Sequence, residues 1–266
     1  MRADQYSHGL MVDATRSPPG TLAEYDALLF DLDGVITKTA AVHAQAWKAL
    51  FDEFLHGWAS EHGEPFQPFE IVDDYVRYVD GKRRYDGVAS FLESRGIGLP
   101  RGEPTDPPGA PTVCGLGNRK DVFFLAAVEE QGVEVFDDAV ALLEAARSAG
   151  KAVAVVSASE NCDPILRRVG LLDHFDVRVT GREASAWELP GKPAPDTFLK
   201  AAELLGVAPA RAVVLEDAIS GVQAGQAGEF GLVIGVDRGE AGDALAANGA
   251  DLVVSDLTEL VPTLQP

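Results

Sequence analysis

Short apolar runs that stop at polar residues or glycines recur along the chain, and they predict buried strands. The predicted strands cover residues 27–30, 152–156, 177–180, 212–215, 232–236 and 252–254. Between them, apolar positions at helical spacing predict helices over 139–149 and 218–227. Two further helices are expected, one that begins with Asp163 as its cap and one that ends at Leu205. Alternating strands and helices are typical of a parallel sheet covered on both faces, so we predict an α/β fold.

Residues 40–136 interrupt this alternation. Helical spacing there predicts helices over 42–58, 69–78, 87–94 and about 118–130, with no strand pattern among them. Five prolines between Gly96 and Pro111 predict an irregular loop. We therefore expect four parts, namely an N-terminal tail (1–21), a core in two segments (22–39 and 137–266) and a helical insertion (40–136).

The composition excludes several classes of partner. A net charge of -20 argues against nucleic acid or an anionic membrane as partner. No apolar run approaches the roughly 20 residues that span a bilayer, and the first twenty residues lack the apolar centre of a signal peptide. Two cysteines, Cys114 and Cys162, are too few for a disulfide scaffold and fit a reducing compartment. We expect a cytoplasmic protein that acts as a monomer.

The stretch Ala27 to Thr39, ALLFDLDGVITKT, carries the first candidate chemistry, because its apolar run stops at Asp31 and Asp33. Residues two apart on an extended chain point the same way, so both carboxylates can face one space. Repulsion and burial make that arrangement unfavourable, and a divalent cation would offset it while one acid attacks and the other carries protons. On this stretch alone, a chemically silent Asp-Gly turn explains the pattern equally well.

Other polar residues also follow strands at their carboxyl ends, where ligands bind in such sheets. Ser157 follows the second strand, Lys192 lies after the third, and Glu216 with Asp217 follows the fourth. Ser157 and the backbone N–H of Ala158 suit a phosphoryl group, and the acids suit Mg²⁺. Each also has a structural explanation: Ser157 can cap a turn, Lys192 can be a surface lysine, and the two acids can cap a helix.

Four motifs in this order, DLDGVIT, VVSAS, GKPAPD and LEDA, resemble those of the haloacid dehalogenase-like phosphotransferases. The resemblance spans about Tyr25 to Val254 and implies a Rossmann-like, doubly wound core with a helical cap inserted after the first strand. It implies that Asp31 is the nucleophile that becomes an aspartyl phosphate and that Asp33 is the general acid and base. The Mg²⁺ ligands that it implies are Asp31, the backbone carbonyl of Asp33, Glu216 and Asp217.

The resemblance also implies a set of residues that bind the substrate, a small sugar phosphate. They are Thr37, His43, Arg84, Lys120, Ser157, Ala158, Asn161 and Lys192. Arg84 would hold a second phosphate, and Lys120 would face the active site from the cap. For His43, a structural role among its apolar neighbours remains equally open.

The implied reaction is that of a phosphomutase, which interconverts beta-glucose 1-phosphate and glucose 6-phosphate through a bisphosphate. A Mg²⁺-dependent sugar-phosphate phosphatase is the alternative, and a phospho-acceptor signalling domain would leave the cap and Asp33 unexplained. The chain departs from the family in places. Lys38 stands where relatives often carry an acid, Glu160 where mutases carry a lysine, and the proline-rich loop has no counterpart.

Overall fold

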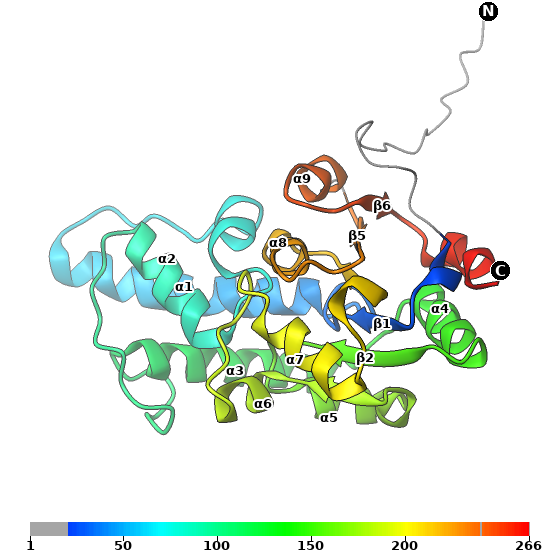
Figure 1. Ribbon diagram of the computed structural model, residues 1–266. Coiled ribbons are helices and arrows are strands. Elements are labelled where there is room, and N and C mark those ends of the chain that lie inside the picture. Colours follow the sequence, from blue (N-terminus) through cyan, green and yellow to red (C-terminus); the bar gives the residue numbers. More distant parts are fainter. Residues whose placement is uncertain (1–20, 240, 266) are drawn as a thin grey trace, which may run out of the picture.

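The centre of the molecule is a parallel sheet with the strand order β3-β2-β1-β4-β5-β6 (Figure 1). The computed structural model describes residues 21–239 and 241–265, so the predicted tail lies outside it apart from Thr21. The strands are β1 Ala27–Phe30, β2 Ala152–Val156, β3 Val177–Val179, β4 Ala212–Glu216, β5 Leu232–Val236 and β6 Leu252–Val254. The predicted α/β class with a parallel sheet is confirmed.

Successive side chains of a strand point to opposite faces, so each strand feeds two apolar layers. On one face Leu28 and Phe30 pack with residues such as Leu142, and on the other Leu29 packs with residues such as Phe198. The core helices are α4 Asp137–Ser148, α5 Cys162–Arg168, α6 Gly181–Ala186, α7 Asp196–Leu205, α8 Ile219–Ala227 and α9 Gly242–Ala247. Helices thus cover both faces, as expected for a doubly wound core.

The chain between β1 and α4 is helical, and its helices pack together beside the sheet (Figure 1). They are α1 Ala40–His62, α2 Arg84–Ser94, α3 Val113–Gln131 and the π-helical turn η2 Tyr75–Val79. They share an apolar cluster of their own, in which Phe51 stacks on Trp47. The ring centroid of Phe51 lies 4.0 Å from that of Phe91 and 5.1 Å from that of Phe69.

The predicted helix over 69–78 is shorter and less regular than expected. The N–H of Phe69 donates to Asp52, and the N–H of Glu70 donates to Asp74. Helical structure begins at Asp73 and continues as the π-helical turn η2, and the N–H of Asp80 then donates to the carbonyl of Tyr75, five residues earlier. Elsewhere in this segment, α2 begins three residues before the predicted start and α3 five residues before it. Thr112 caps α3 by accepting from the N–H of Gly115, and the glycines in its first turns conceal the start of the helix in the sequence.

The core matches its predicted elements with smaller differences. Asp163 was expected to cap α5, but Asn161 stands at that position and Asp163 instead pairs with Arg178 at 3.0 Å. The short helices α6 and α9 were not predicted, since six residues are too few for a clear period. The remaining short turns are η1 Leu22–Glu24, η3 Leu172–His174, η4 Pro209–Arg211 and η5 Leu257–Leu264.

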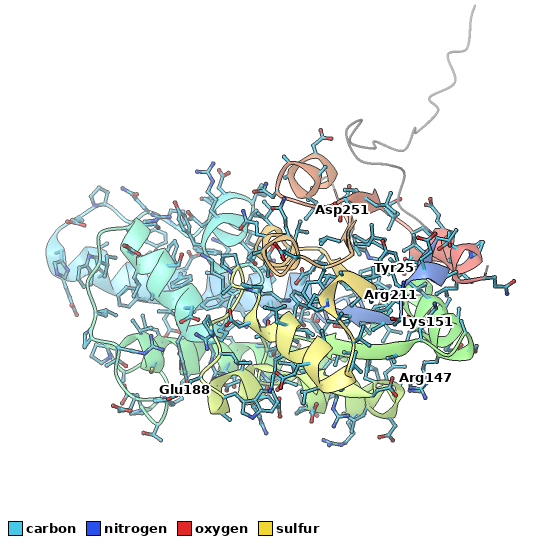
Figure 2. The ribbon with its side chains drawn as sticks, in the orientation of Figure 1. Tyr25, Arg147, Lys151, Glu188, Arg211 and Asp251 are labelled. Carbon is cyan, nitrogen blue, oxygen red and sulfur yellow. The ribbon has the colours of Figure 1, made fainter. Side chains whose placement is uncertain are left out.

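Basic side chains hold the chain at the start of β1, at the edge of the sheet opposite the carboxyl ends of the strands. Lys151 donates to the backbone carbonyls of Ala23 and Tyr25, and Arg211 pairs with Asp26 at 2.7 Å (Figure 2). Across the described ranges of the chain, no helix combines the length and apolar character needed to cross a membrane.

The aromatic cluster of α1 and α2 should carry much of the stability of the inserted helices. Phe51 is fully buried, so Phe51→Ala should lower the free energy of unfolding by about 3 to 5 kcal/mol, through lost burial and a cavity. Chemical denaturation measures the change. Leu125→Ala is the control, because Leu125 is 44% exposed and its loss should cost less than about 0.5 kcal/mol. Equal effects of the two substitutions would contradict the packing described.

Candidate active site

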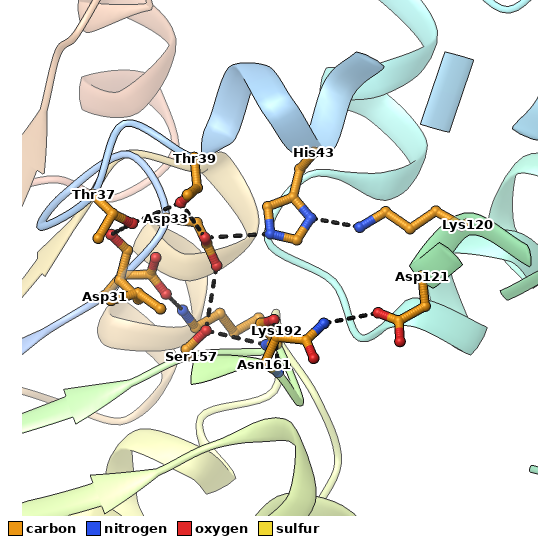
Figure 3. Close-up of polar contacts among 12 residues, drawn as sticks. Asp31, Asp33, Thr37, Thr39, His43, Lys120, Asp121, Ser157, Asn161 and Lys192 are labelled. Atoms are coloured by element: carbon orange, nitrogen blue, oxygen red, sulfur yellow. Dashed lines mark hydrogen bonds and ion pairs between the residues drawn. The ribbon is translucent and has the colours of Figure 1, made fainter. Parts of the chain in front are cut away.

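The carboxyl ends of β1, β2 and β4 bring the predicted polar residues together. These strands are neighbours in the sheet, with β1 paired to β2 on one side and to β4 on the other. Asp31, which follows β1, therefore lies beside Ser157, which follows β2, and beside Glu216, which ends β4. Figure 3 shows Asp31 and Ser157. The backbone N–H of Asp31 donates to the carbonyl of Leu215 and fixes its position at the sheet edge.

Lys192 joins the acids of β1 and β4. Its ammonium lies 2.5 Å from the Asp31 carboxylate and also contacts the Glu216 carboxylate, and the side chain is only 2% exposed. Burial alone would lower the pKa of Lys192, but the two carboxylates outweigh burial and raise it. The ammonium therefore stays charged between the acids.

Buried carboxylates outnumber the buried ammonium at this edge. Burial raises the pKa of Asp31 well above its usual value despite Lys192, because Glu216 and Asp33 add negative charge. The pKa of Asp217 is raised in the same way, by burial and then by Asp80 and Glu216. Among the described residues, no three His, Cys, Asp or Glu side chains converge as a complete metal-binding group. The surplus of buried carboxylate oxygen nevertheless fits a divalent cation in charge and in ligand type.

Two glycines let these acids lie against the backbone. Gly34 has φ of 92°, which favours glycine, and a Cβ there would stand 1.8 Å from the Asp217 carboxylate. A Cβ on Gly221 would stand 1.9 Å from the Glu216 carboxylate. Any larger residue at either position would displace an acid of the site.

Asp33 lies beside Asp31 but in a different environment. Thr39 donates a hydrogen bond to its carboxylate, and Ser157 donates a longer one at 3.4 Å (Figure 3). Burial would raise the pKa of Asp33, but His43, Thr39 and Lys120 outweigh it and lower the pKa to about 2. The two acids thus have pKa values displaced in opposite directions, because their surroundings differ.

His43 and Lys120 form a line that leads from the cap to Asp33 (Figure 3). The Lys120 ammonium lies 2.5 Å from Nδ1 of His43, and Nε2 of His43 lies 3.3 Å from the Asp33 carboxylate. Burial and Lys120 lower the pKa of His43, and burial lowers the pKa of Lys120 to about 7. A neutral His43 that accepts from Lys120 at Nδ1 carries its proton on Nε2, toward Asp33. Its ring stacks on Phe124 at 4.0 Å, so it also has a structural contact.

Arg84 of the inserted helices reaches the core. Its guanidinium lies 3.0 Å from Asp121 on α3 and 2.7 Å from Glu160, which follows β2. Asn161 donates to Asp121 at 2.7 Å, so two polar bridges cross between the inserted helices and the core here. The sequence did not suggest that the predicted cation would be flanked by two carboxylates.

A single cavity receives most of the predicted residues. Those that line it are Asp31, Asp33, His43, Arg84, Lys120, Ala158, Asn161 and Asp217. Ser157, Lys192 and Glu216 lie buried behind these residues. Thr37 is fully buried and does not line the cavity; its hydroxyl bonds the hydroxyl of Thr39, and its backbone forms a bridge with Asp33.

Sequence reasoning missed several residues of the site. Asp80 lines the cavity, and burial raises its pKa to about 7. Asp121 directly follows the predicted Lys120, so an acid beside that lysine was a signal that could have been noticed. Thr39 gave no signal, because its bond to Asp33 depends on how the loop turns. Arg101, from the proline-rich loop, also lines the cavity.

Comparison with known proteins places these residues in a family. The sequence model of the haloacid dehalogenase-like hydrolases matches residues 25–228. A protein of Mycobacterium bovis named beta-phosphoglucomutase is 52% identical over 238 residues, which is 88% of this chain and 91% of that protein. Hexitol phosphatase A of Escherichia coli is 29% identical over 90% of this chain and 94% of its own. Among solved structures, a beta-phosphoglucomutase from Clostridium difficile superposes with a TM-score of 0.68 at 24% identity, over 89% of this chain and 93% of its own.

Removal of Lys192 should destabilise the fold in a pH-dependent way. Lys192→Met leaves buried carboxylates without their cation, and in EDTA the free energy of unfolding should fall by on the order of 3 kcal/mol at pH 8. Lys192 lowers the pKa of Asp31, so its loss raises that pKa further. An acid with a raised folded pKa stabilises at low pH and loses that contribution as pH rises, so the deficit should be smaller at pH 5.

Denaturation curves at both pH values measure this effect. Lys200→Met is the matched control, since Lys200 pairs with the exposed Glu203 and should change stability by less than about 0.5 kcal/mol. A deficit that is equal at pH 5 and pH 8 would contradict the role given to Lys192.

Proposed function

Since the chain belongs to the haloacid dehalogenase-like hydrolase family, we propose that it is a beta-phosphoglucomutase. It interconverts beta-D-glucose 1-phosphate and glucose 6-phosphate through an aspartyl phosphate and glucose 1,6-bisphosphate. The observation that carries the proposal is the 52% identity to the mycobacterial protein of that name, which extends over nearly the whole of both chains. The paired acids in one cavity supply the chemistry that the reaction needs.

Asp31 is the nucleophile in this proposal. A carboxylate oxygen of Asp31 attacks phosphorus, the bond from phosphorus to the donor oxygen breaks, and the phosphoryl group becomes an acyl phosphate on Asp31. Lys192, 2.5 Å from that carboxylate, lowers its pKa against the effect of burial and offsets negative charge on the transferring group. The hydroxyl of Ser157 and the backbone N–H of Ala158 bind phosphoryl oxygens.

Asp33 moves the proton. It protonates the oxygen that leaves phosphorus and then takes the proton from the sugar hydroxyl that receives the phosphoryl group back. The hydrogen bond from Thr39 and the line from Lys120 through His43 hold its carboxylate toward the reacting oxygens. His43 and Lys120 are therefore positioning residues in this proposal, and Thr37 acts through Thr39.

Mg²⁺ is the proposed cofactor, with Asp31, Glu216, Asp217 and the backbone carbonyl of Asp33 as the groups that would hold it. The surplus of buried carboxylates supports this choice, since their raised pKa values report negative charge that a cation would offset. When bound, Mg²⁺ supplies positive charge that stabilises the transferring phosphoryl group.

The helices α1 to α3 act as a cap over the cavity. Arg83 donates to the carbonyl of Leu189, and Ser220 donates to the carbonyl of Asp80, so polar contacts seat the cap on the core. A closed cap excludes water, which would otherwise take the phosphoryl group from Asp31. Arg84 and Asn161 also line the cavity, and we assign to them the end of the substrate that is remote from Asp31.

We also propose that the enzyme works in the cytoplasm as a monomer. Both cysteines, Cys114 and Cys162, are buried free thiols, which suits a reducing compartment.

A sugar-phosphate phosphatase is the second candidate, and the likeness to hexitol phosphatase A favours it. Both activities use Asp31 and Asp33, and they differ only in whether a sugar hydroxyl or water receives the phosphoryl group. A single assay separates them, because it follows both products from one substrate.

Beta-glucose 1-phosphate with Mg²⁺ and a trace of glucose 1,6-bisphosphate is the substrate mixture for that assay. Glucose 6-phosphate should form in at least about tenfold excess over free phosphate, because the closed cap keeps water from the aspartyl phosphate. Excess EDTA should abolish turnover. Free phosphate as the main product would support the phosphatase, and full activity in EDTA would contradict the proposed cofactor.

Asp31→Asn should abolish both product channels while the protein stays folded. The amide cannot attack phosphorus, so turnover should fall below about 1% of the wild-type rate. Acid-quenched samples should show the mass of a phosphoryl group on the wild-type protein and none on the variant. Asp243→Asn, which changes an exposed acid of α9, is the control and should leave the rate unchanged. Substantial residual turnover would remove Asp31 from this role.

A further inference from the structure

Five cationic side chains line the cavity, and they differ in how they are engaged. They are Lys82, Arg83, Arg84, Arg101 and Lys120. Lys82 donates to Ser90, Arg83 pairs with Asp86, Arg84 pairs with two acids, and Lys120 contacts His43. Within the described residues, the Arg101 side chain makes no hydrogen bond or ion pair. It is exposed at the cavity, and its positive charge is available to a ligand.

Arg84 by itself is a poor site for a phosphate in this chain. Its one positive charge lies between the carboxylates of Asp121 and Glu160, at 3.0 and 2.7 Å, so the group as a whole is negative. A phosphate dianion that approaches it meets net repulsion unless another cation is present. Glu160 contributes half of the opposing charge.

The backbone of the proline-rich loop that carries Arg101 is anchored to α3. The carbonyl of Arg101 accepts from the N–H of Cys114, at the start of α3. Asn118 on α3 donates to two carbonyls of the same loop and accepts from the hydroxyl of Tyr85, the neighbour of Arg84. Arg84 and Arg101 both line the same cavity.

We propose that Arg101 binds the phosphate that is not being transferred and so makes the site specific for sugar bisphosphates. This inference rests on the proposed function, since a mutase must hold a bisphosphate with both phosphates at once. Guanidinium suits the task because its planar donors bind two phosphate oxygens together. In a chain of net charge -20, an unpaired cation at the cavity also offsets the general repulsion of an anionic substrate.

Equilibrium binding tests the proposal without turnover. In the Asp31→Asn background, calorimetry measures the Kd of glucose 1,6-bisphosphate and of inorganic phosphate, which has no second phosphate to hold. Arg101→Ala should weaken bisphosphate binding at least about tenfold and change phosphate binding less than about twofold. Arg101→Lys should restore part of the loss, because it keeps the charge and loses the paired donors.

Arg77→Ala is the matched control, because it removes an exposed cap arginine that does not line the cavity. It should leave both constants unchanged. The proposal would be overturned if Arg101→Ala left bisphosphate binding unaffected, or if it weakened the binding of both probes equally. It would also be overturned if the Asp31→Asn protein bound the bisphosphate no more tightly than inorganic phosphate. If the wild-type protein fails to isomerise glucose 1-phosphate while Arg101→Ala still weakens bisphosphate binding alone, the proposed function falls and the assignment of Arg101 stands.

Discussion

The excess of buried negative charge at the carboxyl edge of the sheet is the constraint on which the rest of the site depends. Asp31, Glu216 and Asp217 share one buried ammonium, that of Lys192, and burial raises the pKa of Asp31 and of Asp217. Such a cluster is unfavourable for folding alone. The apolar layers on both faces of the sheet supply the stability that tolerates it, and the surplus of negative charge suits the cation proposed for the site.

Polar contacts join the cap to the core near the site. Arg84 reaches Glu160, Asn161 reaches Asp121, and Ser220 reaches the carbonyl of Asp80. The aromatic cluster of the cap lies within the cap, while Phe124 and Val128 of α3 join one of the apolar layers of the sheet. Polar contacts at a cavity can be exchanged for contacts to a charged ligand at modest net cost, so the substrate can compete for them. In the proposed mechanism, substrate binding and cap closure are therefore linked at these residues.

Sequence patterns predicted the strands well and the inserted helices less well. The strands are short apolar runs with clear ends, and all six occur within about a residue of their predicted bounds. The helix expected over 69–78 begins only at Asp73 and is mostly π-helical, a departure from the regular helical period that apolar spacing does not encode. The start of α3 was missed because Gly115 and Gly117 weaken the helical signal, although they allow Ala110 and Tyr85 to pack closely.

The sequence by itself determined that Asp31, Ser157, Glu216 and Asp217 meet at one edge, because parallel strands place their carboxyl ends together. Only the tertiary structure decided which charges touch. Lys192 enters between Asp31 and Glu216, and Arg84 lies between Asp121 and Glu160. The physical reason is that periodicity encodes the faces and ends of elements. The partner of a long charged side chain depends instead on how separate elements pack.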